Sequence, residues 1–200
     1  MTTNKKTGRH LDLGCGQHPR NPYGLSELYG VDISPQAGSG GGFDIRRANL
    51  AIEPIPFEDG FFNTVSAFDF IEHIPRQAIY PAEKSVRLPF IALMDEVWRV
   101  LKKDGLFYAV TPAYPSLQAF QDPTHVNFIT EETHQYFCGE TPAGRMYGFN
   151  GRFEVCRAHW ALHKNTHSAE YTWRKSFRDW HWKHFKGGLS HFLWELRAVK

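Results

Sequence analysis

Two glycines and an acidic residue stand at spacings that suit a ligand pocket. Gly14 and Gly16 close an apolar run that begins at Leu11, and Asp32 lies in a second apolar run. Glycines after a strand let the backbone approach a ligand more closely than a side chain would allow. A carboxylate at the end of the next strand can accept two hydrogen bonds from the hydroxyls of a ribose. The pattern predicts a nucleotide-shaped pocket at the edge of a parallel sheet.

The glycine loop is poorly suited to a pyrophosphate. The dinucleotide fingerprint needs a third glycine, three residues after the second, where a helix can start. That position holds Pro19, and Pro22 follows closely. Prolines this close together shorten or abolish the helix whose N-terminus would bind phosphates. Asp12 would repel a phosphate but suits an ammonium group, so the loop favours a ligand with an amino group.

Several segments resemble, in order, the motifs of the class I (Rossmann-like) methyltransferases that use S-adenosylmethionine. The likeness covers roughly the first two thirds of the chain, and several motifs in order are far more specific than one. The matching segments are residues 12–16 (the glycine motif), 44–50 (the third strand and the adenine-contacting pair), 55–63 (the approach to strand four), 65–74 (strand four and its loop) and 101–110 (a turn and strand five).

The resemblance implies S-adenosylmethionine as cofactor and an α/β fold. The expected sheet is Rossmann-like, seven-stranded and mostly parallel, with a C-terminal antiparallel hairpin and helices on both faces. Asp12 would help to hold the cofactor's amino group, and Asp32 its ribose. The implied cofactor-binding residues are Asp12, Gly14, Cys15, Gly16, Asp32, Ile33, Asn49, Leu50, Phe68 and Asp69.

Three features depart from the family pattern. The first helix is short or missing, because only residues 23–28 could form it. His18 stands where the family often has its third glycine. Asn49 stands where an aspartate is more usual, although its amide can still hydrogen-bond an adenine edge.

Histidines after the predicted fourth and fifth strands are the candidate catalytic residues. A hydroxyl acceptor must lose its proton as the new bond forms, and histidine is the natural base near neutral pH. His125 is the first candidate, because ligands bind near the carboxyl ends of such strands and Asp122 could orient its imidazole. His73, beside Glu72, is the second. The alternative for both histidines is a structural role in a loop or a pocket wall, and we expect no metal.

Apolar periodicity places these residues on a framework of strands and helices. The predicted strands are residues 9–13, 29–33, 63–68, 106–111, 153–163 and 190–200, of which the last two would form the antiparallel hairpin. The predicted helices are one with the apolar stripe Ile91, Met94, Trp98 and Leu101, and a short one at residues 130–137. Residues 38–42 form a glycine-rich connector, and residues 76–85 a polar loop.

Cations and large rings alternate along residues 173–186. This combination could stack bases while neutralising phosphates. At helical spacing, however, Trp173, Phe177, Trp180 and His184 share one face, which is typical of an amphipathic helix packed on its own domain or on a second copy of the chain. We rank packing or homodimerisation first, a lid over the substrate pocket second and nucleic-acid contact third.

Length and composition indicate one domain. The 200 residues suit a single α/β domain over residues 1–200, with a core at about 9–163 and an aromatic and basic insertion at about 165–188. A formal net charge of +2 indicates no particular partner, and three cysteines are too few for a disulfide framework or a cysteine zinc site. No apolar run approaches the ~20 residues of a membrane span, and residues 1–10 lack a signal-peptide core. We expect a cytoplasmic protein.

These observations predict a methyltransferase that acts on a small-molecule or sugar-bearing acceptor, at oxygen. Enzymes that methylate amino groups of bases usually present Asn/Asp-Pro-Pro-aromatic after strand four, whereas residues 68–71 read Phe-Asp-Phe-Ile. One alternative is a methyltransferase of RNA or another nucleic acid that uses the basic aromatic segment. The other is a non-catalytic domain that binds the cofactor or a partner.

Overall fold

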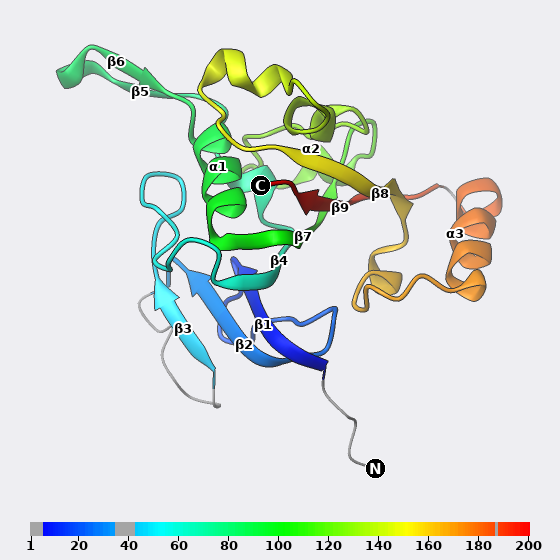
Figure 1. Ribbon diagram of the computed structural model, residues 1–200. Coiled ribbons are helices and arrows are strands. Elements are labelled where there is room, and N and C mark those ends of the chain that lie inside the picture. Colours follow the sequence, from blue (N-terminus) through cyan, green and yellow to red (C-terminus); the bar gives the residue numbers. More distant parts are fainter. Residues whose placement is uncertain (1–5, 35–42, 187) are drawn as a thin grey trace.

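The computed structural model describes residues 6–34, 43–186 and 188–200, and these contain one seven-stranded sheet in the order β3-β2-β1-β4-β7-β9-β8 (Figure 1). The strands are β1 (Lys6–Leu13), β2 (Leu25–Asp32), β3 (Asp44–Arg47), β4 (Phe62–Phe68), β7 (Leu101–Pro112), β8 (Phe153–Ala161) and β9 (His191–Ala198). The first five are parallel, and β9 pairs antiparallel with both β7 and β8. The predicted mostly parallel sheet with a C-terminal antiparallel hairpin is therefore confirmed.

Within the described residues, helices are fewer than the resemblance implies. The α-helices are α1 (Pro89–Val100), α2 (Gln118–Gln121) and α3 (Trp173–Phe185), and the 3-10 helices are η1 (Ile71–His73), η2 (Pro81–Glu83), η3 (Thr133–Phe137), η4 (Ala143–Tyr147) and η5 (His163–Asn165). The described connections from β1 to β2 and from β3 to β4 contain no α-helix. Residues 23–28, the only candidates for a first helix, form none, because residues 25–28 are already the first half of β2. The short helix expected at 130–137 is the 3-10 helix η3.

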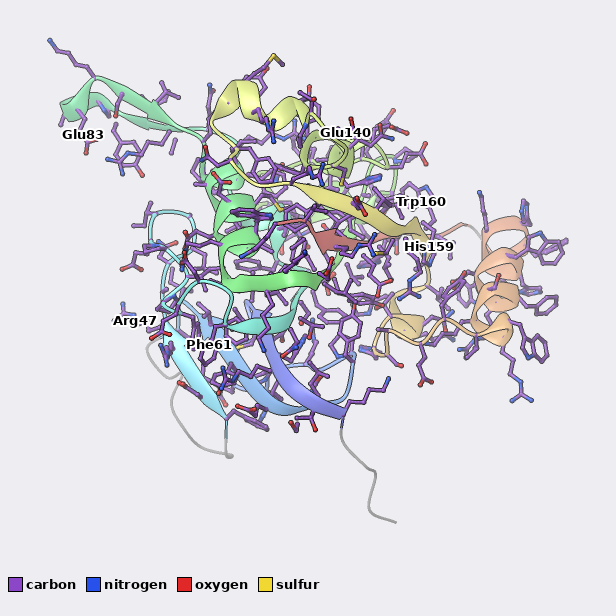
Figure 2. The ribbon with its side chains drawn as sticks, viewed as in Figure 1. Arg47, Phe61, Glu83, Glu140, His159 and Trp160 are labelled. Carbon is purple, nitrogen blue, oxygen red and sulfur yellow. The ribbon has the colours of Figure 1, made fainter. Side chains whose placement is uncertain are left out.

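The predicted polar loop at residues 76–85 is a second correction. It contains β5 (Ala78–Tyr80) and η2, and it leads into β6 (Ser85–Arg87), which pairs antiparallel with β5. This hairpin projects away from the sheet, with Glu83 near its tip (Figure 2). A three-residue strand lacks the period-two apolar signal that a buried strand has, so the polar composition concealed it.

Helix α1 packs on the sheet through a face one residue away from the expected stripe. Its buried side chains are Pro89, Phe90, Leu93, Met94, Val97 and Val100. Pro89 suits the first turn, because its missing N–H needs no partner there. Ile91 and Trp98 are only partly buried, and Leu101 already belongs to β7. The helix was predicted correctly, and Met94 of the predicted stripe is buried, but the buried face is centred about a third of a turn from that stripe.

Helix α3 does not pack its aromatic face on the domain. Trp173, Phe177 and Trp180 are 75%, 58% and 51% exposed. Asp179 is the buried residue of α3, and its Oδ1 accepts hydrogen bonds from Leu162 N at 3.0 Å and Asn165 Nδ2 at 2.6 Å. The hydrogen bonds of Asp179 thus hold α3 on the domain, while its aromatic rings stay exposed. The expectation that the aromatic face packs on its own domain is therefore wrong. No helix in the described part of the chain has the length and apolar character needed to cross a membrane.

A buried histidine makes stability depend on pH. His10 hydrogen-bonds Thr64 Oγ1 at 2.6 Å and Ser66 Oγ at 2.9 Å, and burial lowers the pKa of His10 from 6.5 to about 3. Below pH 6.5 the unfolded chain binds a proton at His10 that the folded protein excludes. The contribution of neutral His10 to the free energy of unfolding is therefore complete above pH 6.5 and is lost as the pH falls toward 3.

We expect the His10→Gln variant to be less stable than the parent protein near neutral pH, but its deficit to shrink in acid. The glutamine lacks the protonation cost, so the difference in unfolding free energy should be roughly 2 kcal/mol smaller at about pH 4.5 than at about pH 7.5. Urea unfolding of both proteins at the two pH values measures this change. An equal deficit at both would show that His10 does not stay neutral in the fold.

Candidate functional site

The glycine loop and the acid at the end of β2 meet, as the sequence predicts. Gly16 N donates a 2.8 Å hydrogen bond to Asp32 Oδ2, and Ser34 N donates to Asp32 Oδ1 at 2.8 Å. Gly14 N donates to Val31 O at 2.9 Å. These bonds hold the loop after β1 against the carboxyl end of β2. The Asp32 side chain makes the polar contact between the two.

The two glycines serve different purposes. Both have a positive φ, +64° at Gly14 and +57° at Gly16, which only glycine adopts without strain. A Cβ on Gly14 would lie 2.4 Å from Cδ2 of Phe70, so Gly14 makes room for that ring. A Cβ on Gly16 would meet no atom of the described residues within 4 Å. Open space beside a bare backbone, next to the Asp32 carboxylate, fits a ribose and the chain attached to it.

Cys15 and Asp12 face the protein interior. The Cys15 Sγ occupies the space that a Cβ on Gly30 would need, at 2.5 Å. Asp12 is 2% exposed; its Oδ1 accepts from Ser66 Oγ at 2.6 Å and its Oδ2 from Arg20 N at 2.8 Å, and burial raises its pKa to about 7. Both carboxylates of the site, Asp12 and Asp32, thus have protein partners on each oxygen, but Asp12 is buried whereas Asp32 is only half-buried. The bond to Ser66 links the glycine loop to β4, and the contact of Asp12 with the cofactor's amino group stays a prediction.

The residues expected near the adenine are only partly arranged for it. Ile33 is 58% exposed directly after Asp32, which offers an apolar surface to a base. The Asn49 side chain accepts from Ala51 N at 3.2 Å and shapes a turn, and Leu50 is buried in the core. The glycine-rich connector at 38–42 lies outside the described residues.

Phe68 and Asp69 separate at the end of β4. Phe68 is buried in a second apolar cluster with Tyr108 and Val110, so its ring belongs to the core. Asp69 has a φ of +49° and accepts hydrogen bonds from Nε2 of His163 at 2.9 Å and of His191 at 3.1 Å. Burial would raise the pKa of Asp69, but these two bonds outweigh it and hold the pKa well below its usual range.

A cluster of Glu72, His73 and His125 lies at the carboxyl ends of β4 and β7. Glu72, in η1, is 1% exposed, and its Oε2 accepts from Thr111 Oγ1 at the end of β7 at 2.9 Å. Its Oε1 has no hydrogen-bond partner among the described residues and lies 4.0 Å from His125 Nε2. The rings of His73 and His125 are 4.8 Å apart between centroids. Burial raises the pKa of Glu72 to about 7.

The cluster lies next to the glycine loop. Phe70, which contacts Gly14, is two residues before Glu72 in the same turn. The backbone carbonyl of Glu72 accepts from the N–H groups of Val126 and Asn127, at 3.0 and 2.9 Å. These bonds bring the loop that carries His125 against η1. Both candidate histidines therefore meet at the edge of the sheet where the predicted cofactor-binding residues of the glycine loop lie.

Asp122 does not orient His125, which corrects the predicted pair. Asp122 Oδ1 accepts from the N–H and the hydroxyl of Thr124, at 2.8 and 2.7 Å. The His125 ring instead bonds the carbonyl of Ala119 through Nδ1 at 3.2 Å, and the carboxylate that faces it is Glu72. A turn of three residues directs the Asp122 side chain back onto its own loop, as aspartate commonly does.

Sequence reasoning missed the partners that lie far away in the chain. It noted Glu72 only as a neighbour of His73 and did not single out Thr111, His163 or His191. The one available signal was the Glu-His pair directly after strand four, where an acidic side chain reaches the ligand edge of the sheet.

Comparison with known proteins identifies a family and several solved structures with a similar fold. The family model described as "Methyltransferase domain" matches residues 1–197. A search of curated proteins gives no match. An S-adenosylmethionine-dependent methyltransferase from Mesorhizobium loti superposes with a TM-score of 0.59 at 16% identity, over 98% of this chain and 94% of that one.

Two archaeal structures are similar to the same degree. A methyltransferase from Haloferax volcanii, in complex with the Trm112 methyltransferase activator, has a TM-score of 0.62 at 16% identity, over 98% of this chain and 84% of that one. An S-adenosylmethionine-dependent methyltransferase from Archaeoglobus fulgidus has a TM-score of 0.58 at 16% identity, over 97% and 86%. At such low identity these likenesses concern the fold alone.

Proposed function

Because this chain belongs to the methyltransferase-domain family, we propose that it transfers a methyl group from S-adenosylmethionine to an oxygen of a small-molecule or sugar-bearing acceptor. S-adenosylmethionine is the cofactor, and family membership sets aside the non-catalytic alternative. The observation that carries the oxygen assignment is the cluster of Glu72, His73 and His125. It places basic groups beside the glycine loop, where a hydroxyl proton can be lost.

The cofactor supplies an electrophilic methyl group and a good leaving group, so the protein mainly aligns the reactants and keeps the site dry. Asp32 is placed to accept hydrogen bonds from the ribose, and Gly16 leaves space for the chain attached to it. As the methyl carbon leaves sulfur and bonds to the acceptor oxygen, the hydroxyl proton must depart. Glu72 and the two histidines are the groups that can assist its departure.

Exposed aromatic rings beside His125 support a small organic acceptor. Ala119, whose carbonyl holds His125, precedes Phe120, which stacks on Phe128 with ring centroids 5.0 Å apart. Tyr114 lies edge-on to Phe120, with centroids 6.3 Å apart. All three rings are 44–56% exposed. Apolar walls with a few polar groups are typical of small-ligand sites.

The test is incubation of the protein with methyl-labelled cofactor and a metabolite extract, followed by mass spectrometry. We expect a labelled ether or ester from a small molecule, with at least tenfold less label from the His125→Ala variant. His184→Ala, on exposed α3, is the matched control and should keep full activity. Label on nitrogen or carbon would overturn the oxygen assignment.

The nucleic-acid alternative keeps one observation in its favour, which is α3. Its uncovered rings and its exposed cations Arg174, Arg178 and Lys183 could stack bases and neutralise phosphates. An RNA pool included in the same incubation tests it. Label in RNA, with binding that weakens steeply as salt rises, would replace the small-molecule proposal.

A further inference from the structure

We infer that Glu72, His73 and His125 form a binding site for a divalent transition-metal ion such as Zn²⁺, Mn²⁺ or Co²⁺. One ligand atom of each residue lies within 4.8 Å of the others. One carboxylate with two imidazoles is an established donor set for such ions, and it leaves coordination positions open for a substrate. The inference rests on the proposed function for its role in catalysis, but the site itself stands on geometry.

The hydrogen bonds around both histidines leave Nε2 with the free lone pair. The carbonyl of Ala119 can only accept, so Nδ1 of His125 carries the proton in their 3.2 Å contact. The hydroxyl of Thr124 donates to Asp122, so Nδ1 of His73 donates to Thr124 Oγ1 at 3.0 Å. Metal-binding histidines characteristically donate their other ring N–H to a carbonyl or another acceptor, which fixes the tautomer.

The carboxylate of Glu72 has a buried oxygen that a cation could bind. Glu72 is 1% exposed, its Oε2 is held by Thr111, and its Oε1 has no hydrogen-bond partner in the part of the chain that the structure describes. An unpartnered buried carboxylate oxygen is costly, and a cation between Oε1 and His125 Nε2 would satisfy it. These two atoms are 4.0 Å apart. Neighbouring ligands at about 2.1 Å from a tetrahedral ion are about 3.4 Å apart. The Glu72 and His125 atoms would therefore approach each other by about 0.6 Å on binding, and no pair of the cluster by more than about 1.4 Å.

The neighbouring cluster of Asp69, His163 and His191 is a weaker candidate, because each oxygen of Asp69 already accepts a hydrogen bond from a histidine. A substitution in this second cluster is therefore the control for metal binding at the first.

A cation in this site would bind the acceptor hydroxyl and lower its pKa, so that the proton leaves to water when the acceptor binds. In this arrangement His125 is a ligand and does not take up the proton itself. Since three protein ligands leave two or three positions on a five- or six-coordinate ion, we expect acceptors with two adjacent oxygens to bind best.

The test is Co²⁺ binding to the full-length protein after treatment with a chelator, followed by visible absorption. We expect one ion per chain, and at least 100-fold weaker binding for Glu72→Gln and for His125→Asn. His163→Asn should bind as the parent protein does. Thermal unfolding of each variant without metal separates ligand loss from misfolding, and Glu72→Gln retains the bond from Thr111.

Two results would overturn the site: absence of stoichiometric binding in the folded parent protein, or binding that is lost only in His163→Asn. Full methyl transfer by chelator-treated protein would overturn the catalytic role of the ion while leaving the proposed function intact. Binding that requires Glu72 and His125, in a protein that labels no acceptor, would support the site and count against the proposed function.

Discussion

Asp32→Ala is expected to weaken S-adenosylmethionine binding by tenfold or more, because a hydrogen bond to a charged group contributes about 1.5–3 kcal/mol. Asp32 stands at the end of β2, next to the open space at Gly16. The alanine removes the acceptor for the ribose and also the contact that positions Gly16 N. Calorimetric titration with the cofactor measures the loss.

Two further variants make this result specific. Asp32→Asn keeps the size of the side chain and one acceptor oxygen, so its affinity for the cofactor should lie between those of the parent protein and Asp32→Ala. Asp44→Ala removes an exposed carboxylate at the far end of β3, where Asp44 pairs with Arg46, and should leave the affinity unchanged. Equal affinities of Asp32→Ala and the parent protein would remove Asp32 from the cofactor site.

Substituting the two glycines of the loop should separate folding from binding. Gly14→Ala places a Cβ 2.4 Å from the Phe70 ring at a φ of +64°, so overpacking adds to backbone strain. We expect it to destabilise the protein by about 3 kcal/mol. Gly16→Ala carries only the backbone strain, about 1 kcal/mol, because its Cβ points into open space.

Gly16→Ala should lose little stability but much of its affinity for the cofactor. The added methyl group occupies the space that we assign to S-adenosylmethionine, so binding should weaken at least tenfold in a protein that still unfolds cooperatively. Urea unfolding and calorimetric titration of both variants measure the two effects. A Gly16→Ala protein with unchanged affinity would place the cofactor elsewhere.

Local pattern was sufficient for most of the strands. The predicted strands at 9–13, 63–68 and 153–163 overlap β1, β4 and β8, because apolar residues in a buried strand form a short continuous or alternating run. The short hairpin of β5 and β6 was missed, because it carries no such run. The alternation of rings and cations in α3 indicated a helix correctly but not which face it buries, since Asp179 makes the contact.

The sequence by itself determined the methyltransferase resemblance, the glycine turn and the acid at Asp32, because each depends on residues close together in the chain. Only the tertiary structure decided which side chains meet. The Thr111 hydroxyl reaches Glu72 across 39 residues, and His191 reaches Asp69 across 122. Such partners depend on which strands lie side by side, and that arrangement forms when the whole sheet buries its apolar faces together. For the same reason only the structure showed that Asp12 is buried and bonded to Ser66 of β4, while its contact with the cofactor's amino group stays a prediction.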